Sequence, residues 1–266
     1  MLSRHLFSIS SPRRGEEVKR SMKKRIRLDM LLVEAGLAES VLSALPLIMA
    51  GKVLVDGRVA DKAGAEVSRE SEVSIKTDAP FVGRGGLKLE GALRDFDVMV
   101  RGLIAMDVGS STGGFTDCLL KNGASRVYAV DVGKGIIDDS LRRDPRVCLL
   151  EGRNIRHLEA EDVGEKMDIA TVDVSFISLK KVIPKLKEFL KPFGMVLALI
   201  KPQFEAGKEN VGKGGVVRDP SVHQAVVEDI KSFSERAGFK VLGVSPSKIT
   251  GAKGNVEFLI HLMTEN

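Results

Sequence analysis

An apolar strand, a glycine-rich turn and a helix follow one another in residues 103–121, and this unit constrains the fold more than any other feature of the chain. A dinucleotide-binding turn has the pattern G-x-G-x-x-G after a strand, and its middle glycine lets the backbone approach a pyrophosphate. Here the three positions hold Gly109, Ser111 and Gly114. The sequence therefore predicts a tight turn and close helix–strand packing without a pyrophosphate site.

The chain beyond residue 86 continues as alternating strands and helices. Apolar runs predict strands at 103–108, 127–132, 147–150, 169–174 and 195–200. Helices are expected at 87–96, at 114–121, from the fourth strand through residue 190, and at 220–237. Two late strands, 240–244 and 256–262, predict a hairpin at one edge of the sheet. This alternation is typical of an α/β fold with a doubly wound sheet.

A smaller module precedes this part of the chain. Helical spacing predicts a helix at 27–36 and a second at 41–49, which Ser40 is expected to cap. Short strands are expected at 53–55, 58–59 and 73–75, with a hairpin turn at Asp56-Gly57. These elements predict an α+β domain over residues 24–78.

The remaining boundaries follow from composition. Residues 79–86 contain Pro80, Gly83, Gly85 and Gly86 and are expected to be a linker to the α/β domain at 87–266. Residues 1–23 are rich in Arg, Lys and Ser, and we expect a disordered tail or a misassigned start, with Met22 as the true start.

Bulk properties exclude several classes of protein. The net charge is +5 and the pI about 9.1, which fits a nucleic-acid partner without requiring one. The two cysteines, Cys118 and Cys148, and the four histidines have no metal-ligand spacing, so we expect no metal and a reducing compartment such as the cytoplasm. No apolar run approaches the roughly 18 residues of a membrane span.

A second acidic strand end supports a nucleoside cofactor. Asp131 follows the glycine turn by about twenty residues, the spacing at which a carboxylate accepts hydrogen bonds from ribose hydroxyls. A turn without a pyrophosphate glycine then favours S-adenosylmethionine, and a plain βα turn with a surface aspartate is the alternative. The candidate cofactor-binding residues are Asp107, Gly109, Ser110, Ser111, Thr112, Gly113, Gly114, Phe115, Asp131, Val132, Asn154 and Asp173.

A near match to a P-loop lies at residues 207–214. The pattern G-x-x-x-x-G-K-[ST] ends here in Gly214, so the hydroxyl that would bind magnesium is missing. We interpret the segment as a basic loop in which Lys208 and Lys213 face the backbone of a substrate, or as a merely solvated glycine loop.

Two charged residues mark the ends of apolar strands. Asp173 lies at the end of the strand at 169–174, and Lys201 directly follows the strand at 195–200. Ligands of open α/β sheets bind at the carboxyl ends of strands, so both residues are candidates for chemistry. Chemistry on a ribose hydroxyl needs a base, because this hydroxyl is a poor acid. A lysine whose pKa is lowered by a neighbouring cation can remove the proton of the hydroxyl.

Residues 25–266 resemble the TlyA family, also labelled hemolysin A. The matching stretches are RLDMLLVEAGL (27–37), GRGGLKL (83–89), DVGSSTGGFTD (107–117), TVDVSFISL (171–179), KPQFE (201–205) and TGAKGNVEFL (250–259). The resemblance implies an S4-type RNA-binding domain joined to a Rossmann-like, FtsJ-like methyltransferase domain. It implies S-adenosylmethionine as cofactor and 2′-O-methylation of a cytidine in ribosomal RNA or a ribosomal subunit. It places the catalytic set on Lys88, Asp173, Lys201 and Glu257.

The chain departs from the family in the small domain. Hydrophobic residues follow Ser40 where a basic residue is usual, and Pro46 is expected to interrupt the second helix, which puts RNA contact by that helix in doubt. The residues still expected to contact RNA phosphates here are Arg25, Arg27, Lys52 and Arg58.

Three other functions compete with this interpretation. A membrane-active hemolysin needs a lipid-facing surface or a strong amphipathic segment, and the sequence has neither. A non-catalytic RNA-binding assembly factor would leave the four catalytic candidates unexplained. A small-molecule methyltransferase would leave the RNA-binding type of domain unexplained.

Overall fold

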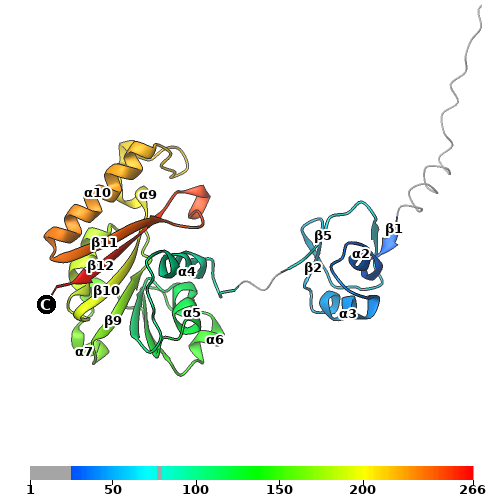
Figure 1. Cartoon of the computed structure of the whole chain (residues 1–266), viewed down its shortest axis with the longest axis horizontal. Helices are drawn as coiled ribbons and strands as arrows, with labels where there is room; N and C mark the ends of the chain where they lie inside the picture. Colours follow the sequence, from blue (N-terminus) through cyan, green and yellow to red (C-terminus); the bar gives the residue numbers. More distant parts are fainter. Residues whose placement is uncertain (1–24, 77–79, 266) are drawn as a thin grey trace, which may run out of the picture. The chain divides into compact units, whose positions relative to one another are not determined.

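The computed structural model describes residues 25–76 and 80–265, and the chain divides into two compact units, Met1–Asp78 and Ala79–Asn266 (Figure 1). The segment 1–23, for which the sequence predicts a disordered tail or a misassigned start, lies outside the described residues.

The first unit packs two helices against two small sheets. Its buried core consists of Leu28, Leu32, Ala44, Ile48 and Val53. The helices are α2 (Leu28–Glu34) and α3 (Val41–Met49). The strands are β1 (Arg25–Arg27) paired with β4 (Glu66–Ser68), and β2 (Val53–Val55) between β3 (Arg58–Ala60) and β5 (Val73–Ile75).

Local signals in this unit act as the sequence predicts, with one exception. Asp56 and Gly57 both have positive φ, 48° and 75°, which a two-residue hairpin turn requires. Ser40 caps α3 by accepting a hydrogen bond from the backbone N–H of Ser43 at 3.1 Å. The expectation that Pro46 interrupts α3 is wrong, because the helix continues to Met49. The carbonyl that loses its partner belongs to Leu42, which is exposed and open to water.

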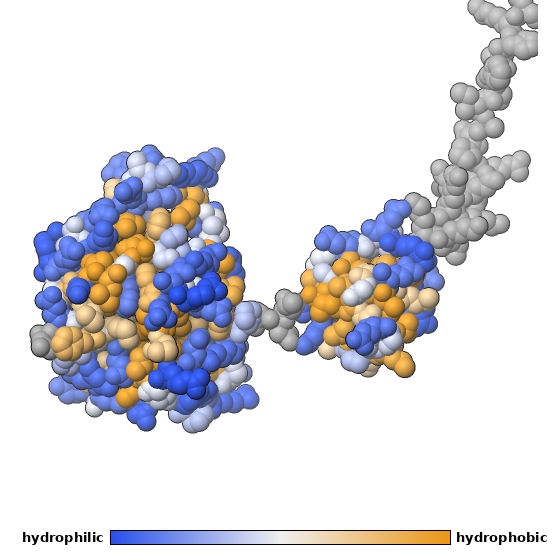
Figure 2. Space-filling view, in the orientation of Figure 1, coloured by the Kyte–Doolittle hydropathy of each residue, from blue (hydrophilic) through white to orange (hydrophobic). Residues whose placement is uncertain are grey.

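The surface of this unit carries exposed hydrophobic side chains (Figure 2). Leu42 and Met49 of α3 are 79% and 75% exposed, and Val59 of β3 is 59% exposed. Helix α3 has no basic residue, so its surface is apolar where a phosphate-binding helix would be cationic.

The second unit is built on a seven-stranded sheet with the order β11-β12-β10-β9-β6-β7-β8. Six strands point in the same direction, and β12 is antiparallel to both of its neighbours, β10 and β11. The strands are β6 (Ile104–Val108), β7 (Arg126–Asp131), β8 (Val147–Glu151), β9 (Met167–Val172), β10 (Leu190–Ile200), β11 (Phe239–Pro246) and β12 (Phe258–Thr264).

Helices cover both faces of this sheet (Figure 1). One apolar cluster joins sheet residues to α8 and α10, and another joins sheet residues to α4, α5 and α6. The helices are α4 (Gly85–Asp95), α5 (Gly114–Lys121), α6 (Asp139–Arg142), α7 (Ala160–Val163), α8 (Ile183–Leu186), α9 (Pro202–Glu205) and α10 (Pro220–Arg236). The predicted doubly wound α/β architecture is confirmed, and the predicted strand pair β11–β12 forms at one edge.

The continuous helix predicted from β9 through residue 190 is wrong. The chain forms a 3-10 turn at Leu179–Lys181 and the short helix α8, and β10 already begins at Leu190. Pro184 explains the break, because its ring would clash with the carbonyl of the residue four positions earlier in a longer helix.

The described part of the segment expected as a linker belongs to the second unit. Phe81 is buried in the core beneath α4 and α5. The backbone N–H of Val82 donates to Asp117 at 2.9 Å, and Lys121 donates to the carbonyl of Pro80 at 2.7 Å. Helix α4 then begins at Gly85. The chain from residue 80 onward is thus packed on the α/β unit.

Candidate functional site

The glycine turn after β6 has the tight geometry that the sequence predicts. Gly109 has φ of 83°, and a Cβ there would lie 2.5 Å from the carbonyl oxygen of Asp173. Gly114 begins α5, and a Cβ there would lie 3.1 Å from the carbonyl oxygen of Gly83. The turn therefore needs glycine at two positions so that three backbone segments can meet.

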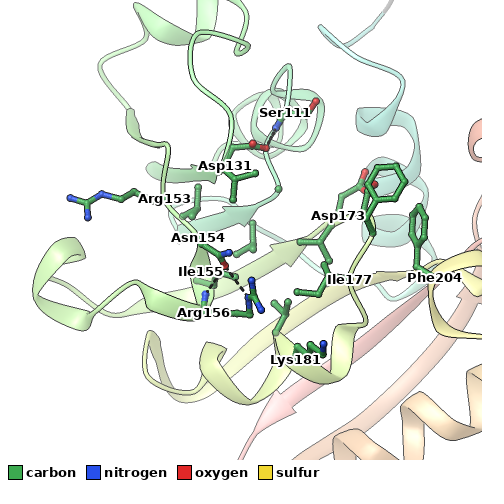
Figure 3. A pocket seen from close by; sticks show the side chains of 18 of the residues that line it. Ser111, Asp131, Arg153, Asn154, Ile155, Arg156, Asp173, Ile177, Lys181 and Phe204 are labelled. Carbon is green, nitrogen blue, oxygen red and sulfur yellow. Dashed lines mark hydrogen bonds between the residues drawn. The ribbon is translucent and has the colours of Figure 1, made fainter.

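A cavity of about 790 Å³ opens beside this turn, at the carboxyl ends of β6, β7 and β9 (Figure 3). Asp131 is fixed in it by two backbone donors, with Ser111 N at 2.8 Å from Oδ2 and Gly133 N at 2.7 Å from Oδ1. Asn154 accepts from the backbone N–H of Arg156 at 3.1 Å. A smaller cavity of about 110 Å³ lies against the same turn.

Most of the predicted cofactor residues line one or both cavities. The larger cavity is lined by Gly109, Ser111, Asp131, Val132, Asn154 and Asp173. The smaller cavity is lined by Gly109, Ser110, Ser111, Thr112, Gly114, Phe115 and Asp173. Gly113 lines neither, and with φ of 98° it packs instead against Leu141, whose Cδ1 would lie 2.2 Å from a Cβ.

Asp107 also lies outside both cavities and is completely buried beneath the turn. Thr116 donates to its Oδ2 at 2.7 Å, and Thr171 donates to its Oδ1 at 3.1 Å. Burial raises the pKa of this carboxyl to about 7, because the charged form loses its hydration and the hydrogen bonds from Thr116 and Thr171 offset this loss only in part. Asp107 therefore joins the turn, α5 and β9.

Lys201 and Asp173 form the first ion pair of the site. Their strands, β10 and β9, are parallel neighbours, and each residue directly follows its strand. Lys201 Nζ lies 2.5 Å from Asp173 Oδ1 and donates to Ser175 Oγ at 2.9 Å. The lysine side chain is only 10% exposed, so the ammonium is held at the edge of the cavity that Asp173 lines.

Lys88 and Glu257 form the second ion pair. Lys88 comes from α4 and Glu257 immediately precedes β12, and Lys88 Nζ lies 2.5 Å from Glu257 Oε2. Gln203 Nε2 donates to the other oxygen, Oε1, at 3.1 Å. Gln203 is two residues after Lys201, so the segment that follows β10 carries both Lys201 and a side chain that contacts Glu257.

The electrostatic arrangement differs from the one expected from sequence. Each lysine is paired with a carboxylate, and the charge of each pair is balanced within it. Among residues 25–76 and 80–265, no group of three His, Cys, Asp or Glu side chains is placed to hold a metal ion. The two ion pairs consist of positioned lysines and carboxylates.

The residues predicted to contact RNA lie on both units. Arg25 is exposed, and so is Arg27, which pairs with the buried Asp29 at 2.6 Å. Lys52 is half-buried and Arg58 is exposed on β3. On the second unit, Lys208 and Lys213 are exposed in the loop before α10. That loop makes an isolated bridge between Gly212 and Val216 and does not run directly into a helix, so it is not a P-loop.

Sequence reasoning missed several residues of the site. Ser175 and Gln203 each lie two positions after a predicted catalytic residue, and both fall in stretches that the resemblance had singled out. Phe176 has φ of 62°, is 90% exposed, and lies with its ring 4.9 Å from that of Phe204. Side chains of Arg153, Arg156 and Lys181 line the larger cavity (Figure 3).

Two family models match the two units of the chain. The family model described as FtsJ-like methyltransferase matches residues 81–264, and the S4 domain model matches residues 26–73. In the part of the chain that the structure describes, no helix combines the length and apolarity of a bilayer span.

Relatives match over most of both chains. "Putative rRNA methyltransferase YqxC" of Bacillus subtilis is 49% identical over 90% of this chain and 86% of its own. The 16S/23S rRNA (cytidine-2'-O)-methyltransferase TlyA of Mycobacterium tuberculosis is 43% identical over 92% of both chains. A solved structure, "Putative hemolysin from Streptococcus thermophilus", is 43% identical with a TM-score of 0.71, covering 91% of this chain and 90% of its own.

Proposed function

The chain belongs to the TlyA family, in which an S4 domain precedes an FtsJ-like methyltransferase domain, and from this premise we propose that it methylates a ribose 2′-hydroxyl of ribosomal RNA. The methyl donor is S-adenosylmethionine. The target nucleotide that we propose is a cytidine, as in the name of the mycobacterial relative, and the reaction takes place on cytoplasmic ribosomal RNA or subunits.

One observation carries this proposal. Two lysine–carboxylate pairs, Lys201–Asp173 and Lys88–Glu257, lie at one edge of the sheet. Gln203, two residues after Lys201, contacts the second pair through Glu257. Asp173 also lines the cavity beside the glycine turn. A base for a hydroxyl and a nucleoside-sized cavity therefore share one wall, which a transfer between a nucleoside cofactor and an alcohol requires.

The residues of the cavity fit S-adenosylmethionine. Each oxygen of Asp131 accepts one backbone N–H and keeps a lone pair that can accept a ribose hydroxyl. Val132, Ile155 and Ile177 provide apolar lining for an adenine ring. The turn holds Ser111 where a pyrophosphate would need glycine, which favours a cofactor without phosphates.

The reaction needs a proton acceptor and fixed geometry. When bound, S-adenosylmethionine supplies a methyl group on a positively charged sulfur. Lys201 Nζ, in its neutral form, takes the proton from the ribose hydroxyl as the oxygen becomes nucleophilic. Asp173 and Ser175 hold this amine in place, so little motion is needed at the moment of transfer. Lys88 and Glu257 keep the opposite side of the site charged and ordered.

RNA affinity is assigned to both units. The exposed cations Arg25 and Arg58 of the first unit, and Lys208 and Lys213 of the second, can neutralise phosphates. Helix α3 has no part in this neutralisation because it carries no basic side chain. We propose that residues 24–78 act as an RNA-binding domain and not in the chemistry.

The test is methyl transfer to ribosomal RNA that lacks its ribose methylations. The full-length protein is incubated with labelled S-adenosylmethionine and purified subunits, and the RNA is digested and analysed by mass spectrometry. We expect one labelled 2′-O-methylnucleoside and no transfer to RNA carrying a 2′-deoxy residue at that position. Methylation of a base, or lysis of erythrocytes without the methyl donor, would contradict the proposal.

A further inference from the structure

In the residues that the structure describes, the side-chain amide of Gln203 is hydrogen-bonded at its NH₂ group but not at its carbonyl oxygen. Its Nε2 donates to Glu257 Oε1 at 3.1 Å, whereas its own Oε1 is buried and receives no hydrogen bond from residues 25–76 or 80–265. Buried polar atoms are nearly always paired, so an unpaired amide oxygen next to a predicted catalytic group calls for a physical reason.

The orientation of this amide is set by chemistry. An ionised carboxylate only accepts hydrogen bonds, so the NH₂ group of Gln203 has to face Glu257. The carbonyl oxygen must then point the other way, where the described part of the chain offers it no donor. A flipped amide would satisfy neither Glu257 nor itself, because two oxygen acceptors would meet.

Glu257 is restrained on three sides by this arrangement. Lys88 Nζ donates to Oε2 at 2.5 Å, and Gln203 Nε2 donates to Oε1. Gly251 closes the third side, since a Cβ at that position would lie 2.0 Å from Oε1. With its side chain 2% exposed, Glu257 has little access to water that could replace the amide.

The free energy of folding does not explain why a glutamine occupies position 203. A hydrogen bond to a charged group stabilises more than a neutral one, but a buried acceptor without a donor costs a comparable amount. The two effects nearly cancel, and an apolar side chain of the same length would fold about as well. The value of the amide therefore lies in the direction it imposes on Glu257.

We propose that Gln203 is a positioning residue of the methyl-transfer site, which acts by aiming the Glu257 carboxylate at Lys88. This inference rests on the proposed function for its kinetic consequence. Gln203 lies on α9, directly after the strand end that carries Lys201. Gln203 therefore reaches the Lys88–Glu257 pair from the helix that immediately follows Lys201.

Two variants separate positioning from structure. Gln203→Met keeps the length of the side chain without polar atoms, and Gln203→Glu places an acceptor against Glu257. We expect the single-turnover methyl-transfer rate to fall roughly 10- to 100-fold for Gln203→Met, the loss expected for one charge-assisted hydrogen bond. Gln203→Glu should be slower still. Affinity for the cofactor and for RNA should stay near wild type, as should the melting temperature of Gln203→Met.

A double-mutant cycle with Glu257→Gln then decides the matter. If Gln203 acts through Glu257, Gln203→Met should cost no further rate once Glu257 has been neutralised. An equal loss of rate in both backgrounds would overturn the proposal, as would a wild-type rate in Gln203→Met, or a loss of melting temperature that parallels the loss of rate.

The same cycle can be read without activity. In urea denaturation, the effects of Gln203→Met and Glu257→Gln on the unfolding free energy should be coupled. This coupling is expected even if the wild-type protein methylates no ribosomal RNA. An absence of methylation would refute the proposed function and not the interaction between the two side chains. Additive effects on the unfolding free energy would show that the two side chains do not interact, and would refute the role of Gln203 alone.

Discussion

Lys201 Nζ lies 2.5 Å from Asp173 Oδ1, and the two residues each follow one of two adjacent parallel strands. The pair is set by the sheet itself and does not depend on a mobile loop. Ser175 adds a hydroxyl at 2.9 Å from the same ammonium. Such a position suits a base whose proton acceptance must coincide with the arrival of a methyl group.

Replacing Lys201 should remove the chemistry and spare the cofactor. We expect Lys201→Ala to lose single-turnover methyl transfer by roughly 10²-fold or more, the usual contribution of a positioned base. Lys201→Arg should fail as well, because guanidinium stays protonated. The exposed Lys240 of β11 provides a matched control, and Lys240→Ala should behave as wild type. A near-normal rate for Lys201→Arg would mean that Lys201 only clamps an anion.

Asp131 should determine cofactor affinity. Asp131→Ala removes the acceptors for the ribose hydroxyls and the partners of Ser111 N and Gly133 N, so binding of S-adenosylmethionine should weaken by roughly 1–3 kcal/mol. Calorimetry measures this loss. Asp139→Ala is the control, since that side chain is 79% exposed and lies outside the cavity. Unchanged affinity in Asp131→Ala, or tighter binding of NAD than of the methyl donor, would refute the site.

The boundary of the α/β unit should decide whether a truncated protein binds the cofactor. A chain that begins at residue 79 keeps Phe81, and one that begins at residue 87 loses Phe81 together with Gly83 and Gly85 beside the glycine turn. We expect the longer form to bind S-adenosylmethionine as the full chain does, and the shorter form to bind poorly. Equal calorimetric affinities of the two forms would contradict this account.

Removing residues 1–78 should weaken RNA binding because the exposed cations of the first unit are lost. For the full chain, the affinity for ribosomal RNA fragments should fall steeply with salt concentration, and the truncated form should show a weaker affinity and a smaller slope. Filter binding between low and physiological salt provides the measurement. If the truncated form binds as tightly as the full chain, the first unit has another role.

Asp107 should make stability depend on pH. Its pKa of about 7 in the folded protein exceeds the ordinary 3.8, so between these pH values the folded state holds a proton that the unfolded state has lost. The unfolding free energy therefore falls as pH rises from about 4 to about 7. Asp107→Asn cannot ionise, and its stability relative to wild type should increase from pH 5 to pH 8 in urea denaturation. If the difference in unfolding free energy between Asp107→Asn and wild type does not change with pH, the buried carboxyl of Asp107 is not uncharged in the folded protein.

Sequence alone determined the elements whose signals are local. The glycine turn, the Ser40 cap of α3 and the Asp56-Gly57 hairpin each depend on a few adjacent residues, and all form as predicted. Asp173 and Lys201 were also accessible, because an apolar run that ends in a charged residue marks the end of a buried strand.

Tertiary structure decided the rest. Lys88 and Glu257 are 169 residues apart in the chain, and only the packing of α4 beside the start of β12 brings them into contact. Tertiary packing also places Gln203 against Glu257 and buries Asp107 outside the cavity. Periodicity and turn chemistry act between neighbours along the chain, whereas the partner of a buried polar group depends on how the layers of the fold meet.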